Sequence, residues 1–134
     1  MTSATEPTHA VEPDRRRTAR TRMGRGLLGM GLLHVVVPGP FVKIVPKALG
    51  APRFWNLAAA AAEIAAGALL VSDDPDKQRA GGWLATATIV GVYPANIEMA
   101  IRAGAPTNPK AIAAWLRLPM QLPMIAQAYS FTKP

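Results

Sequence analysis

Four long apolar stretches separated by short polar connections dominate the chain after residue 22. They cover approximately residues 23–41, 54–71, 80–101 and 111–131. A helix of the length of the second stretch would rise about 27 Å, close to the roughly 30 Å hydrocarbon thickness of a bilayer. The second and third stretches are apolar on all sides, as is typical of membrane helices. The pattern predicts an all-α fold, an integral membrane antiparallel four-helix bundle.

The first 22 residues have a different composition, rich in Thr, Pro and charge and without apolar periodicity. They predict a disordered basic tail in front of a bundle at 23–131. Arginines cluster just before the first apolar stretch, at Arg15, Arg16, Arg17, Arg20, Arg22 and Arg25. Because positive residues favour the cytoplasmic side, the sequence predicts a multi-pass protein of the bacterial inner membrane with both termini cytoplasmic. A cleaved secretory or twin-arginine signal would use the same residues, but no A-x-A cleavage site follows promptly.

Composition narrows the classes of function. Hydrophobic residues make up 50% of the chain and charged residues only 17%, and there is no cysteine. The lack of cysteine excludes disulfides, thiolate metal sites and a dithiol relay within this chain. The net charge of +7 would suit nucleic-acid binding, but the basic residues are not interleaved with aromatic ones on a folded face. We therefore expect the partner surface to be a lipid bilayer, with no nucleic acid, and keep a soluble all-helical protein as the alternative.

Glycine and proline positions predict how the first stretch packs and ends. Gly24 and Gly31 are seven residues apart and share a helix face, which favours close contact with another helix. Pro38 and Pro40 close the helix, because each lacks an amide donor and biases the residue before it away from helix. The connection at 42–53 is apolar enough to form a re-entrant or interfacial segment.

The polar turn at 72–79 predicts that the second and third helices are antiparallel neighbours. Ser72, Asp73 or Asp74 could cap the next helix, with Pro75 in its first turn.

Polar side chains inside the apolar stretches fall at similar depths once the helices alternate in direction. They are His34, Glu63, Asn96, Arg117 and Gln121. Arg117 and Gln121 share one helix face, and Asn56 and Glu63 share another. We therefore predict one polar pocket, formed by these side chains as candidate ligand-binding residues.

Each of these residues also has a structural interpretation. A charge in mid-membrane costs at least a few kcal/mol, so Glu63 would be an ion-pair partner of Arg117, a protonated hydrogen-bonding group, or part of a ligand or proton site. One imidazole, His34, with one carboxylate does not make a metal site, and none is expected. The chain has no G-x-S-x-G, Walker, dinucleotide-binding or HEXXH motif, so the sequence assigns no catalytic residue and leaves open whether it is an enzyme.

The order of these residues resembles the DoxX-like family of small four-helix bacterial membrane proteins, the DoxX and DoxD group. The similarity covers about residues 27–124. It rests on His34 and Pro38 closing the first helix, a connection containing Pro46, the run AAEIAAGALL around Glu63, VYPANIEMA at 92–100 and WLRLPMQ at 115–121. The resemblance implies a four-span inner-membrane protein. The family name derives from a subunit of a thiosulfate:quinone oxidoreductase, which implies quinone-linked redox work.

We expect an accessory or structural subunit of a membrane complex, of respiratory or redox type, with another membrane protein or a second copy as its partner. The alternative is a redox subunit that binds a quinone or another small molecule in the polar pocket. Arg117 or His34 would then donate to a quinone oxygen, and Glu63 would exchange the proton. A transporter is a third hypothesis, although four spans without a repeat are few for alternating access.

Overall fold

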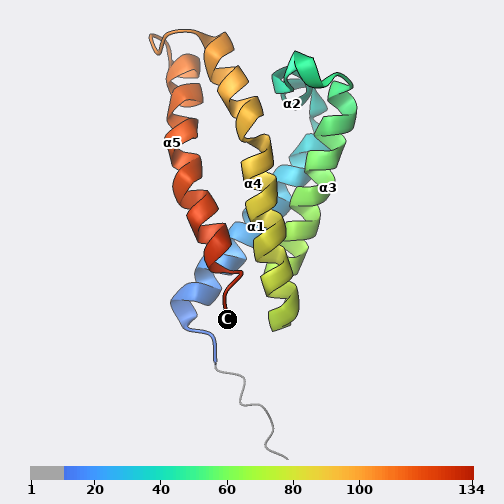
Figure 1. Ribbon diagram of the computed structural model, residues 1–134, viewed down its shortest axis with the longest axis vertical. Helices are drawn as coiled ribbons and strands as arrows, with labels where there is room; N and C mark the ends of the chain where they lie inside the picture. The colour runs from blue at the N-terminus through green and yellow to red at the C-terminus, as the bar shows by residue number, and fades with distance from the viewer. Residues whose placement is uncertain (1–10) are drawn as a thin grey trace, which may run out of the picture.

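The computed structural model describes residues 11–134, a part of the chain that contains helices and no strand. The helices are α1 (Asp14–Val36), α2 (Pro38–Ile44), α3 (Pro52–Val71), α4 (Pro75–Ala103) and α5 (Pro109–Ser130), with a 3-10 turn, η1 (Lys47–Leu49), between α2 and α3. Helix α1 lies against α3, α3 against α4, and α4 against α5 (Figure 1). The predicted all-α class is confirmed.

Two of these helices, α3 and α4, are long and apolar enough to cross a membrane. A third span results if α1 and α2, which are bent by 94° relative to each other, count as one broken span. The apolar pattern predicted four spans, and the structure supports two or three. The difference lies in α5, where Lys110, Arg117, glutamines and prolines interrupt the apolar positions, so α5 is not among the helices apolar enough to cross a membrane.

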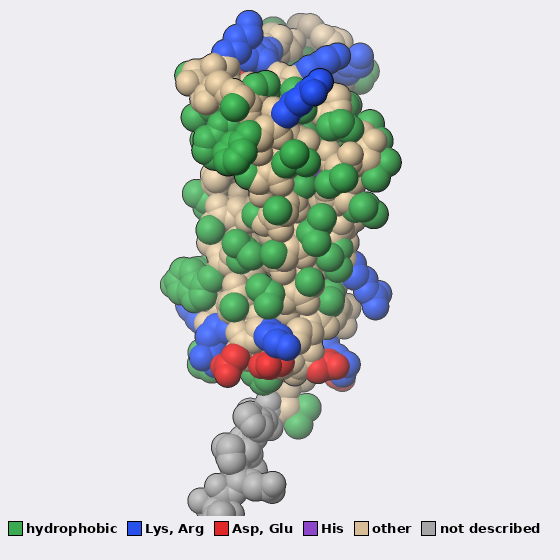
Figure 2. Space-filling model, turned by 90° about the vertical axis from the view of Figure 1, so that its right-hand side faces the viewer, with side chains coloured by type: hydrophobic (Ala, Val, Ile, Leu, Met, Phe, Trp, Pro, Cys, Tyr) green, Lys and Arg blue, Asp and Glu red, His purple; other side chains and the backbone are tan. Residues whose placement is uncertain are grey.

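Many large apolar side chains are exposed on the long helices. On one face of the molecule they spread along its length, while Lys and Arg gather near its two ends (Figure 2). Exposed examples on four helices are Leu32 and Val36, Phe54 and Leu57, Trp83 and Ile101, and Leu116 and Leu122. The surface between the ends is therefore mainly apolar.

The start of α1 differs from the prediction. We expected a disordered tail to residue 22, but α1 begins at Asp14, so residues 14–22 are helical. Of the rest of the predicted tail, residues 11–13 are not helical and residues 1–10 lie outside the described residues. Residues 14–22 are helical because two arginines of this segment bind the ends of other helices.

Arg20 is one of these two arginines, and it is almost fully buried, with 2% of its surface exposed. Its guanidinium donates hydrogen bonds to the backbone oxygens of Leu70 and Ser72, at the end of α3, and to both oxygens of Glu12 (3.1 and 2.8 Å). The last carbonyls of a helix have no partner within the helix and carry partial negative charge, so a cation there is favourable. The Arg20 hydrogen bond is also the main reason that the pKa of Glu12 lies below its usual value of 4.5.

Arg16 binds the end of α5 in the same way. It donates to the backbone oxygens of Ser130 (3.2 Å), Lys133 and Pro134 (3.1 Å). The basic segment thus joins α1 to the ends of α3 and α5.

Glycines allow α1 and α3 to pack closely, as predicted. A Cβ atom added at Gly24 would lie 3.0 Å from the oxygen of Gly67, and one at Gly31 would lie 2.8 Å from the oxygen of Ala60. From the other side, a Cβ at Gly67 would lie 2.6 Å from the oxygen of Gly24. No larger residue fits at these positions without moving the helices apart.

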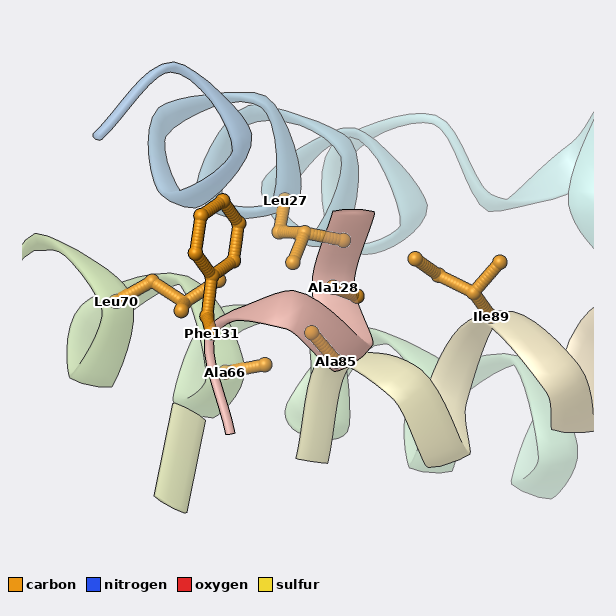
Figure 3. Close-up of a cluster of buried hydrophobic side chains, with 7 residues drawn as sticks. All are labelled: Leu27, Ala66, Leu70, Ala85, Ile89, Ala128 and Phe131. Atoms are coloured by element: carbon orange, nitrogen blue, oxygen red, sulfur yellow. The ribbon is translucent and has the colours of Figure 1, made fainter. Parts of the chain in front are cut away.

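The apolar core lies at the end of the molecule where α5 ends. Side chains from four helices meet there (Figure 3), namely Leu27, Ala66, Leu70, Ala85, Ile89, Ala128 and Phe131. Three of the seven are alanines, so close backbone approach replaces side-chain bulk. Helix α4 starts next to this core, and Asp74 caps it by accepting from the amides of Asp76 (2.9 Å) and Lys77 (3.4 Å), which confirms one of the three predicted caps.

Candidate functional site

A cluster of three buried polar residues lies between α1 and α3. His34 is near the end of α1, and Asn56 and Glu63 are two helical turns apart on α3. His34 Nε2 lies 3.9 Å from Glu63 Oε2, and Asn56 Nδ2 donates a hydrogen bond of 3.0 Å to the backbone oxygen of His34. The three residues are 9%, 3% and 6% exposed, in chain order. We call them the α1/α3 cluster.

Pro38 explains the position of Asn56. In a continuous helix the oxygen of His34 would accept from the amide of residue 38, but proline has no amide hydrogen. Asn56 supplies the missing donor from the neighbouring helix. Asn56 was not among the predicted site residues, and the signal for it was the spacing of seven residues that places it on the same face as Glu63.

The α1/α3 cluster leaves hydrogen-bonding capacity unused. In the described part of the chain, the buried side-chain atoms without a hydrogen-bond partner are His34 Nδ1, Asn56 Oδ1 and Glu63 Oε2. All three belong to this cluster. A buried polar atom without a partner costs about 1–3 kcal/mol, so native proteins contain few of them, and each one calls for a physical explanation.

Helix α2 covers the His34 side of the cluster. The ring of Phe41 packs on the imidazole of His34, with ring centroids 3.8 Å apart and an angle of 30° between the planes. The sharp bend after α1 therefore returns the chain over the cluster and provides an apolar wall.

A second buried polar contact joins α4 and α5. Asn96 Nδ2 donates to Gln121 Oε1 at 2.9 Å, and Gln121 Nε2 donates to the backbone oxygen of Ile89 at 3.4 Å. Asn96 is 8% and Gln121 5% exposed. No atom of this α4/α5 pair is among the buried atoms without a partner between residues 11 and 134.

Arg117 lies apart from both clusters. It is exposed on α5, and across residues 11–134 no carboxylate oxygen lies within 4 Å of its guanidinium. The suggested ion pair between Glu63 and Arg117 is therefore not formed. Of the five predicted pocket residues, the structure brings together His34 with Glu63 and Asn96 with Gln121, and no hydrogen bond or ion pair among the described residues links the two pairs.

The donor sets limit the chemistry of both clusters. Within the described residues, no group of three or more His, Cys, Asp or Glu side chains could hold a metal ion. The α4/α5 pair consists of neutral amides that do not titrate. The α1/α3 cluster combines a carboxyl, an imidazole and an amide, so it is able to accept hydrogen bonds and to bind protons.

Comparison with protein families gives a match over residues 23–132, to the family described as a domain of unknown function (DUF8561). The chain belongs to the DUF8561 family. The DUF8561 match includes both buried polar clusters and begins after Arg16 and Arg20. Searches of curated proteins and of solved structures gave no match. The resemblance to DoxX-like proteins stays a prediction.

Proposed function

We propose that this protein is a multi-pass protein of the bacterial inner membrane and serves there as an accessory or structural subunit of a membrane complex. The observation that carries the proposal is the exposed apolar surface of the long helices, with basic residues near the two ends of the molecule. In water this surface would be costly, and contiguous exposed apolar patches usually mark contacts with lipid or protein. In a bilayer it is the surface that lipid tails and partner helices contact.

The charge distribution supports cytoplasmic termini. Arg16 and Arg20 are engaged within the fold, whereas Arg15, Arg17, Arg22 and Arg25 are exposed at the start of α1. Arg17 also lies 3.8 Å from Asp73, and all four cations lie where anionic lipid headgroups would attract them.

Single-cysteine labelling tests the membrane location, because the chain has no native cysteine. Asp73→Cys in the α3–α4 turn and Thr107→Cys in the α4–α5 loop should react with a membrane-impermeant maleimide from opposite sides of sealed vesicles. Val90→Cys, exposed in the middle of α4, should react only after detergent is added. Recovery of the protein in the soluble fraction, with all three sites equally reactive, would contradict the proposal.

The same method decides whether α5 crosses the membrane. If it does, Lys133→Cys should react from the same side as Asp73→Cys, which is the cytoplasmic side in our proposal. If Lys133→Cys reacts from the side of Thr107→Cys, α5 does not cross, and the contact of Arg16 with the end of α5 is not formed in the membrane.

Mass spectrometry of the protein purified in mild detergent from its native membrane tests the accessory role. A stoichiometric protein partner, or a second copy, supports the role. Recovery of a single chain alone, under conditions that preserve other complexes of that membrane, would argue against it.

The unpaired atoms of the α1/α3 cluster favour a second candidate function, binding of a quinone or another small molecule by a redox subunit. His34 or Asn56 would contact the ligand, and Glu63 would supply or take up a proton. The same purification tests this function, because a bound quinone should be present in the wild type and lost in Glu63→Gln. A quinone retained at equal stoichiometry in both proteins would exclude the cluster as its site.

A further inference from the structure

We propose that Glu63 and His34 form a proton-binding pair, in which the Glu63 carboxyl group holds a proton and exchanges it with the His34 imidazole. The ligand is the proton itself, so the site needs no cavity for a larger molecule. This inference goes beyond the accessory role. It rests on the proposed membrane location, which the cysteine labelling tests separately.

The surroundings of Glu63 disfavour a permanent negative charge. Its side chain is buried, and in residues 11–134 no Lys or Arg nitrogen lies within 4 Å of its carboxyl oxygens. The nearest cationic group is His34 Nε2, at 3.9 Å. Because a carboxylate without a partner in an apolar bundle is expensive, binding a proton is the cheaper way to bury this group.

The helices packed against α3 provide no other charge for Glu63. Helix α1 contributes His34. Helix α2 contributes Lys43, which is exposed, and α4 carries its charged residues near its ends, where Glu98 and Arg102 bind each other at 2.9 Å. Proton exchange of Glu63 therefore depends on His34 more than on any other titratable side chain between residues 11 and 134.

The separation of 3.9 Å between His34 Nε2 and Glu63 Oε2 is too long for a hydrogen bond, but a rotation of either side chain that shortens it by about 1 Å would create one. Transfer then moves one proton from the carboxyl oxygen to the imidazole nitrogen, leaving a carboxylate and an imidazolium, and the reverse step restores both neutral groups. No electron and no further reactant is needed.

The second imidazole nitrogen allows the ring to take up the carboxyl proton. His34 Nδ1 is buried and has no hydrogen-bond partner within residues 11–134, so it can carry the proton of the neutral imidazole while Nε2 accepts the one from Glu63. The hydrogen bond from Asn56 to the backbone of His34 holds this end of α1 in place while the ring changes its protonation state. Asn56 is thus a positioning residue.

Infrared spectroscopy of the protein reconstituted into lipid tests the proposal. The difference spectrum of wild type minus Glu63→Gln should contain the carbonyl band of a protonated carboxyl group. The band should shift in D₂O and disappear with rising pH in a titration from about pH 4 to about pH 10. His34→Gln should move the midpoint of that titration by about one pH unit or more. The matched control Glu98→Gln removes a partly exposed carboxyl group paired with Arg102 and should leave the band unchanged.

Two results would overturn the proposal. The first is the absence of a protonated carboxyl band at every pH, which would show a permanent carboxylate. The second is a band that changes with neither pH nor D₂O, which would show a fixed proton with a purely structural role. Should Glu63→Gln fail to fold, wild-type protein labelled with ¹³C-glutamate identifies the band by its isotope shift. Peptide mass spectrometry after reaction with a hydrophobic carbodiimide then shows whether the protonated glutamate is Glu63 or one of the other three, Glu6, Glu12 and Glu98.

Discussion

Asn96 and Gln121, between α4 and α5, bond to each other and to a backbone oxygen, whereas the α1/α3 cluster leaves three side-chain atoms without a partner among residues 11–134. Both groups are buried to a similar extent. The difference lies in their chemistry. Two amides form a hydrogen bond as neutral groups, whereas the donors and acceptors of a carboxyl and an imidazole change whenever either group binds or releases a proton. Unused hydrogen-bonding capacity, more than burial, distinguishes a candidate site from a structural contact.

The two helix pairs also differ in packing. Helices α1 and α3 approach closely at Gly24, Gly31 and Gly67. Helix α4 approaches α5 in this way at Gly82, next to the end of α5, and elsewhere side-chain hydrogen bonds join it to α5, which contains Pro119 and Pro123. We therefore expect backbone approach to dominate the stability of the first pair and polar contacts to matter more in the second.

Gly67→Leu should have the largest effect. Its side chain would collide with the backbone of Gly24 and Leu28, so α1 and α3 would have to separate, and we expect a loss of about 3 kcal/mol in the free energy of unfolding. SDS-induced unfolding in mixed micelles measures this loss. Gly29→Leu is the matched control, because a Cβ at Gly29 meets nothing within 4 Å. Equal stability of the two variants would show that glycine packing does not distinguish the first pair.

Arg20→Met should be the next most severe change. It leaves the backbone oxygens of Leu70 and Ser72 without this donor and Glu12 without its buried partner. We expect a loss of about 2 kcal/mol in the free energy of unfolding, measured in the same assay. Arg22→Met, at an exposed arginine two residues later, should change stability by less than about 0.5 kcal/mol. If both variants cost the same, Arg20 acts only through its general positive charge.

Asn96→Leu tests the second pair. The oxygen of Gln121 loses its donor, and we expect a cost of about 1 kcal/mol, since polar contacts between membrane helices are individually modest. Arg117→Leu serves as its control on α5, because Arg117 is exposed, and it should alter stability by less than about 0.5 kcal/mol. A neutral Asn96→Leu would show that the α4/α5 pair does not depend on this hydrogen bond.

The ion pair of Glu12 with Arg20 predicts a smaller, pH-dependent effect. The pKa of Glu12 is lower in the folded protein than its usual 4.5. Glu12 therefore stabilises the fold above about pH 4.5, and this contribution is lost as the pH falls from there through the lower folded-state pKa. Wild type should be more stable than Glu12→Gln at neutral pH, and the difference should vanish in acid. A difference that persists below the folded-state pKa would contradict this account.

Glu63→Gln should have the smallest effect on stability, in contrast to its effect on proton binding. The Glu63 side chain makes no hydrogen bond within residues 11–134, and glutamine preserves its size. We expect a change of less than about 0.5 kcal/mol in the free energy of unfolding. A loss of unfolding free energy comparable to that of Asn96→Leu would show that the α1/α3 cluster is a structural contact like the α4/α5 pair.

Local features of the sequence were sufficient for much of the fold. The apolar stretches located the long helices, Gly24 and Gly31 marked the contact of α1 with α3, and Asp74 was among the predicted caps. The start of α1 was not predictable, because the partners of Arg20 lie 50 and 52 residues further along the chain. Composition alone suggested disorder, and only the tertiary contacts explain the helix.

The sequence predicted how far along the bundle the candidate site residues lie, but not which way each helix face points. Counting residues from the helix ends placed His34 and Glu63 at similar heights, and the structure brings them together. The same count placed Arg117 near them, but height along a bundle does not determine which way a helix face turns. Asn96 and Gln121 therefore form a contact of their own, and Arg117 is exposed.

The arginines at the start of α1 have a consequence for the order in which the chain can close during synthesis. The oxygens that Arg20 binds follow it by 50 and 52 residues, and those that Arg16 binds follow it by 114 to 118 residues. Pro134, the last acceptor of Arg16, follows Ser72, the last acceptor of Arg20, by 62 residues, which a ribosome adds in roughly 3 to 12 seconds at about 5–20 residues per second. Throughout that interval Arg20 is able to dock α1 on α3 while Arg16 still waits for its partners. In the nascent protein, α1 can thus pack on α3 first and contact the end of α5 only afterwards.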